Sequence, residues 1–128
     1  MKIDLTSVMV NDQDKALRFY TEVLGFMKKT ELPAGKYRWI TVVSPEAPGG
    51  VQLALEPNAF PAAKVYQKAI FDAGIPATSF GVKDVEAEYE RLTKLGVRFA
   101  AKPNKAEWGV SAVFDDTCGN LIQLHQVR

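Results

Sequence analysis

Few side chains in this 128-residue sequence could act directly on a ligand or a metal ion. Histidine and cysteine occur once each, as His125 and Cys118. Structural zinc sites take several imidazole or thiolate ligands, and a disulfide needs two cysteines, so neither can be built from these two residues alone. Glu56 and His125 remain as candidates for a general base. Cys118 falls in a polar turn, where we expect it to be exposed.

The glutamines Gln52 and Gln123 occupy matching places in a sequence repeat. Landmarks in the first half recur in the second half, 71 or 72 residues later. A nearly constant offset indicates two copies of one structural unit. The matched segments are Val10-Asn11-Asp12 with Val82-Lys83-Asp84, Leu24-Gly25-Phe26 with Leu95-Gly96-Val97, and Val51-Gln52-Leu53 with Ile122-Gln123-Leu124.

Each copy predicts one strand, one helix and three further strands. Asp12 and Asp84 are typical N-caps, and Gly25 and Gly96 are typical helix ends. The fold class is therefore α+β, with two tandem βαβββ repeats in a single domain, 1–128, that form a concave, barrel-like mixed sheet with the helices outside. Repeat one covers about 1–57, the linker about 58–76 with a helix near 62–73, and repeat two about 77–128. The expected strands are 3–10, 26–32, 37–44 and 50–56, then 78–82, 97–101, 110–115 and 120–126.

These segments resemble the vicinal oxygen chelate superfamily, which includes glyoxalase I, bleomycin-resistance proteins, fosfomycin-resistance enzymes and extradiol dioxygenases. The similarity rests on the paired landmarks above, on 15–20 (Lys-Ala-Leu-Arg-Phe-Tyr) and on 116–120 (Asp-Thr-Cys-Gly-Asn). It covers nearly the whole chain. It implies the fold more strongly than a reaction, because this fold supports several chemistries.

The resemblance also implies where a divalent metal would bind. Glyoxalase-type members hold it with histidines on the first strands and glutamates on the closing strands. The matching positions here are Leu5, Ala77, Gln52 and Gln123. Aliphatic side chains offer a metal no donor atom, and neutral amides are poor substitutes for carboxylate or imidazole. We therefore expect no metal cofactor, although a displaced site that uses Glu56 and His125 stays open.

A cavity between the repeats is the expected ligand site. Ser7, Met9 and Ser79 share strand parity with Leu5 and Ala77, so we expect them to line it. Gln52 and Gln123 bind a polar ligand or, alternatively, hydrogen-bond to each other or to water. The tryptophans serve either as pocket walls or as core. The candidate ligand-binding residues are Ser7, Met9, Trp39, Gln52, Glu56, Ser79, Trp108, Gln123 and His125.

Composition limits the possible partners. The chain has 16 Lys and Arg against 15 Asp and Glu, so it lacks the basic footprint of a nucleic-acid binder. No apolar run suggests a membrane span, and no secretory signal is evident, so we expect a cytoplasmic protein.

We expect a small-molecule-binding member of the superfamily that forms a homodimer and lacks the metal site. One alternative is a lyase, isomerase or dioxygenase-like enzyme with a rearranged metal site, so enzymatic activity stays open. The other is an antibiotic-sequestering protein of the bleomycin-resistance type, which the near-neutral charge does not favour because those proteins capture a cationic drug in an acidic groove.

Overall fold

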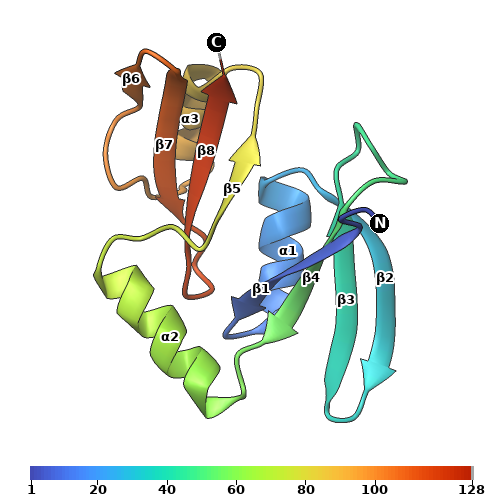
Figure 1. Ribbon diagram of the computed structural model, residues 1–128. Helices are drawn as coiled ribbons and strands as arrows, with labels where there is room; N and C mark the ends of the chain where they lie inside the picture. Colours follow the sequence, from blue (N-terminus) through green and yellow to red (C-terminus); the bar gives the residue numbers. More distant parts are fainter. Residues whose placement is uncertain (128) are drawn as a thin grey trace. The chain divides into compact units, whose positions relative to one another are not determined.

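The computed structural model describes residues 1–127, which form two compact units (Figure 1). The first unit is Met1–Val65, and the second begins at Tyr66. Each unit consists of one four-stranded sheet and a helix that packs against it. The expected α+β class with two βαβββ repeats is therefore confirmed. Among the described residues, no helix is long and apolar enough to cross a membrane.

The first unit begins with a strand, continues through a helical segment and ends with three strands. Its sheet has the order β1-β4-β3-β2, with β1 parallel to β4 and the other neighbours antiparallel. The elements are β1 (Leu5–Val10), α1 (Gln13–Arg18), the π-helical turn η1 (Phe19–Val23), β2 (Met27–Ala34), β3 (Tyr37–Val43) and β4 (Gln52–Pro57).

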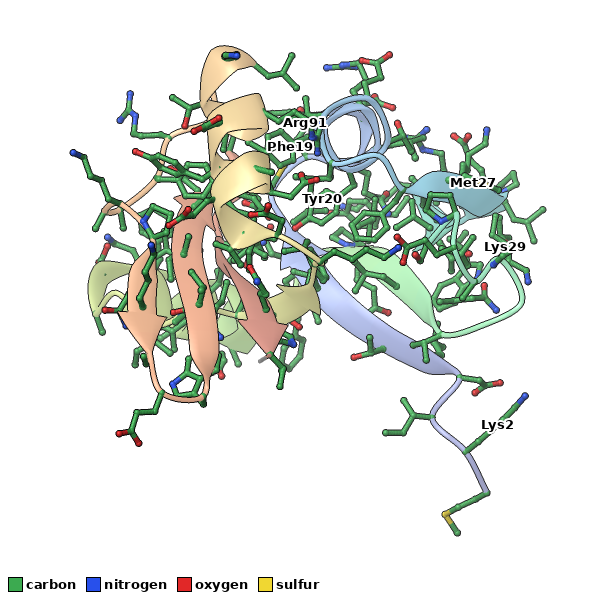
Figure 2. All side chains as sticks on the ribbon, turned by 90° about the horizontal axis from the view of Figure 1, so that it is seen from above. Lys2, Phe19, Tyr20, Met27, Lys29 and Arg91 are labelled. Atoms are coloured by element: carbon green, nitrogen blue, oxygen red, sulfur yellow. The ribbon has the colours of Figure 1, made fainter. Side chains whose placement is uncertain are left out.

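The helical segment of this unit starts as predicted but is not a continuous α-helix. The carboxylate of Asp12 caps it by accepting a hydrogen bond from the Lys15 N–H at 3.1 Å. The π-helical turn then follows, and the Leu24 N–H donates to the Phe19 carbonyl five residues earlier. The wider turn changes the direction in which the following side chains point around the helix axis. Phe19 and Tyr20, which are labelled in Figure 2, are both buried.

The second unit repeats this plan with the sheet order β5-β8-β7-β6. Strand β5 is parallel to β8, and Asp84 caps α3 by accepting from the Ala87 N–H at 3.0 Å. The expected helix in the linker is also present, as α2, which spans the boundary of the two units. The elements are α2 (Pro61–Asp72), β5 (Thr78–Gly81), α3 (Val85–Lys94), β6 (Asn104–Ala106), β7 (Gly109–Asp115) and β8 (Leu121–Val127).

The prediction of a strand at 97–101 is wrong. Only Phe99 in that range forms a bridge, to Phe114 of β7, and the pairing resumes as the three-residue strand β6. The Phe99 ring packs against Tyr89 of α3, with ring centroids 4.7 Å apart, and against Phe114 at 5.6 Å. The apolar pattern of this stretch thus reflects a contact with the helix rather than a continuous ladder.

In each unit the core lies between the helix and one face of the sheet. Val8 and Val10 of β1 and Ile40 of β3 are buried there in the first unit, as Ile122 and Phe114 are in the second. Alternate strand residues point to the opposite face, which we call the open face. Candidate ligand-binding residues therefore have to be sought on the open faces.

A buried glutamine joins α1 to the sheet. The Gln13 side chain donates from Nε2 to the carbonyls of Arg38 at 2.7 Å and Leu55 at 2.9 Å, and its Oε1 accepts from the Arg38 N–H at 3.0 Å. The side chain thus links the first turn of the helix to β3 and β4. Gln13 is 8% exposed, and its bond to the Leu55 carbonyl is buried, so little water is available to replace that bond.

Candidate functional site

The open face of the first unit carries five of the predicted ligand-binding residues. Ser7 pairs with Ala54, and Met9 pairs with Glu56, across the parallel β1–β4 ladder. Their parity is opposite to that of the buried Val8 and Val10. The residues on this face are Ser7, Met9, Trp39, Gln52 and Glu56.

Apolar side chains dominate the part of this face that β2 and β3 form. Trp39 is partly buried, and its neighbour across the β2–β3 ladder is Leu32, which is 57% exposed. Tyr37 follows the same parity as Trp39 on β3. Glu56 is the one charged side chain that β1, β3 and β4 place on this face. The face therefore suits a largely apolar molecule better than a highly charged one.

Gln52 is held by a neighbour within its own unit. The hydroxyl of Thr41 on β3 donates to the Gln52 Oε1 at 2.8 Å. This bond fixes the amide and leaves its N–H₂ group as a donor.

Three polar side chains of the second unit form a connected chain on the open face of β5 and β8. The Gln123 Nε2 donates to the Ser79 Oγ at 3.2 Å. The Ser79 Oγ lies 2.7 Å from the Nδ1 of His125. Gly81 pairs directly with His125, so no side chain on β5 faces the imidazole at that position. All three residues were predicted site residues, and the structure brings them together.

Trp108 lies in the turn between β6 and β7, next to Gly109, and is 50% exposed. The β6–β7 hairpin pairs Ala106 with Gly109 and so leaves only Glu107 and Trp108 in the turn.

A charged cluster lies on the helix side of the first sheet, away from the open face. Arg38 contacts Asp14 and also Glu31 at 2.5 Å, and Lys28 contacts Glu31 at 2.9 Å. The hydrogen bonds that Arg38 donates to Asp14, and to a smaller extent to Glu31, raise the pKa of Arg38. The hydrogen bonds that Glu31 accepts from Lys28, and to a smaller extent from Arg38, lower the pKa of Glu31. The guanidinium is thus already paired with two carboxylates.

Cys118 was expected to be exposed, and that prediction is wrong: the residue is fully buried. It lies in the turn between β7 and β8, which folds around the buried carboxylate of Asp116. Asp116 accepts from the backbone N–H groups of Cys118 at 2.8 Å and Asn120 at 3.0 Å. Gln67 of α2 donates to the side chain of Asn120 at 3.2 Å, which covers the turn. The polar sequence of this turn does not predict that Gln67 packs over it.

Two βαβββ units, each with a helix on one face of the sheet and an open second face, define the glyoxalase-type class of folds. The chain belongs to the Glyoxalase/Bleomycin resistance protein/Dioxygenase superfamily, whose sequence model matches residues 2–124.

Several proteins are similar along nearly the whole length of the chain. The uncharacterized protein YurT of Bacillus subtilis (strain 168) is 60% identical over 98% of this chain and 99% of its own. The crystal structure of UcmS2 superposes with a TM-score of 0.84 at 32% identity, covering 98% and 97% of the two chains. TnmS3, an antibiotic binding protein from Streptomyces sp. CB03234, superposes with a TM-score of 0.79 at 31% identity, covering 100% and 97%.

The residues at the family's metal positions do not fit a divalent ion. Leu5 and Gln52 are direct partners across the β1–β4 ladder, so the first unit presents an alkyl group beside an amide whose oxygen already accepts from Thr41. In the second unit, the corresponding residues are Ala77 and Gln123. Within residues 1–127, no three His, Cys, Asp or Glu side chains gather as a metal site would require.

Proposed function

We propose that this protein binds a small organic molecule noncovalently and uses no divalent metal at the family's metal positions. The observation that carries the proposal is the pairing of Leu5 with Gln52, which puts an alkyl group where glyoxalase-type members have a metal ligand. Without a Lewis acid at that place, an enediolate would lack its stabilising charge. The open face of the first unit then provides apolar contacts through Trp39 and Leu32 and an amide donor from Gln52.

A thermal-shift experiment tests the metal part of this proposal. We expect metal-stripped protein to show no stoichiometric stabilisation by Ni²⁺, Zn²⁺, Mn²⁺ or Fe²⁺. One equivalent of a metal bound tightly by the unmodified chain would overturn the proposal and favour the lyase, isomerase or dioxygenase-like alternative.

The ligand part is tested by screening small molecules and locating the hit with tryptophan fluorescence. The chain has two tryptophans, so Trp108→Phe leaves Trp39 as the reporter and Trp39→Phe leaves Trp108. A ligand at 100 times its Kd stabilises the folded state by about 2.7 kcal/mol, which is easily seen in thermal unfolding. We expect the bound ligand to change Trp39 emission. A hit that leaves Trp39 emission unchanged would place the ligand away from the open face of the first unit.

Antibiotic sequestration is a second candidate function, because TnmS3 is an antibiotic binding protein and is similar over the whole chain. Since the open face of the first unit is largely apolar, we favour uncharged compounds over cationic ones in the antibiotic screen. Growth of a sensitive bacterium that expresses the protein, measured with and without the best binder, separates sequestration from binding alone. Unchanged sensitivity would remove this candidate.

We also propose, from the sequence expectations above, that the protein acts in the cytoplasm as a homodimer. Light scattering coupled to size exclusion, over a hundredfold range of concentration, tests the dimer. A single monomer mass throughout would refute it.

A further inference from the structure

We propose that Gln123, Ser79 and His125 form a hydrogen-bond relay in which the imidazole accepts at Nδ1 and carries its proton on Nε2, where it is a donor for a carbonyl oxygen of the ligand. This inference rests on the proposed small-molecule function and concerns the open face of the second unit by itself. Gln123 and Ser79 are positioning residues in this scheme, and His125 is the residue that contacts the ligand.

The first hydrogen bond of the relay has a fixed direction. An amide N–H can only donate, so the Gln123 Nε2 donates to the Ser79 Oγ. The Nδ1 of His125 lies 2.7 Å from the same oxygen, and the direction of this second bond depends on the tautomer of the ring. We assign the hydroxyl proton of Ser79 to it, so that the Oγ accepts one hydrogen bond and donates one. A neutral ring that accepts at Nδ1 carries its proton on Nε2.

The other nitrogen of the ring faces a position without a side chain. Gly81 pairs with His125 across the β5–β8 ladder, and a Cβ built on Gly81 would lie 3.4 Å from Nε2 and 3.7 Å from Cε1. That is ordinary van der Waals contact, so alanine would fit there but would cover the donor. The glycine therefore leaves room beside Nε2 for a ligand atom.

The tautomer is measured by long-range ¹H–¹⁵N correlation of the imidazole in tag-free protein at pH 8. His125 is the one histidine in the chain, so its signals need no assignment. We expect the Nε2–H tautomer in the unmodified protein and a mixture of the two tautomers in Ser79→Ala. Ser79→Thr should restore the single tautomer.

Ser111→Ala is the matched control. Ser111 pairs with His125 from the other side, on β7, and removing its hydroxyl is the same chemical change. We expect the tautomer to be unaffected in this variant. An Nδ1–H tautomer in the unmodified protein, or equal effects of Ser79→Ala and Ser111→Ala, would overturn the relay.

The ligand class is tested with acetophenone, an aryl ketone, and with α-methylstyrene, which has nearly the same shape but no oxygen. We expect acetophenone alone to shift the Nε2 signal, and Gly81→Ala to weaken its binding about tenfold, as for the loss of one good hydrogen bond, while the tautomer is kept. Equal responses to both compounds, or none to acetophenone, would overturn the carbonyl assignment.

The tautomer is read without any ligand. A failed screen with an intact tautomer would therefore count against the proposed function, whereas a wrong tautomer would count against the relay alone.

Discussion

Replacing Gln13 by alanine is the sharpest test of how the first unit is held together. The substitution removes three hydrogen bonds that join α1 to β3 and β4. The two bonds to the Arg38 backbone are partly buried, so water can replace them in part. The bond to the Leu55 carbonyl is buried, and that acceptor would lose its partner.

The expected loss follows from these environments. An unsatisfied buried carbonyl costs about 1–3 kcal/mol, and each partly replaced hydrogen bond costs about 0.5 kcal/mol more. The sum is about 3 kcal/mol. With an unfolding entropy of about 2.1 cal/mol/K per residue, a cooperative transition of all 128 residues would occur about 10 °C lower.

Gln52→Ala is the matched control, because it makes the same chemical change on the open face. It removes one partly buried hydrogen bond, from Thr41, and should cost no more than about 1 kcal/mol. Thermal unfolding and guanidinium titration of both variants provide the comparison. If Gln13→Ala loses no more stability than Gln52→Ala, the buried amide does not hold the helix to the sheet.

Three further predictions follow from single contacts. Cys118 should resist a thiol reagent such as DTNB in the folded protein and react at once in denaturant, because it is fully buried; fast reaction of folded protein would contradict that burial. Gly109→Ala should lower the unfolding free energy by about 3 kcal/mol or more, measured by denaturant titration, because φ is 152° and the new Cβ would lie 2.0 Å from a backbone oxygen of β8. Glu31→Gln should unfold at a lower temperature than the unmodified protein at neutral pH. Lys28 and Arg38 lower the pKa of Glu31 below its ordinary 4.5, so this difference should shrink as the pH falls below 4.5 toward the folded-state pKa. A difference that does not shrink with falling pH would refute the pairing.

The fold and part of the site were predictable because they depend on local spacing. The repeated landmarks, the caps Asp12 and Asp84, and strand parity predicted two βαβββ units and put Ser7 and Met9 on the face opposite Val8 and Val10. Parity holds along any strand because successive side chains alternate between its faces. The sequence also showed aliphatic and amide side chains at the family's metal positions.

Other features depend on how distant segments meet, and only the tertiary structure decided them. Gln13 looks like an ordinary polar residue in a first helical turn, yet it bonds to strands 25 and 42 residues away. Ser79 and His125 are 46 residues apart and meet because β5 pairs in parallel with β8 in one particular register. Cys118 is buried because its turn packs under Gln67 of α2. Sequence periodicity records which face of its own element a residue occupies, whereas burial and hydrogen bonding depend on what the rest of the chain places against that face.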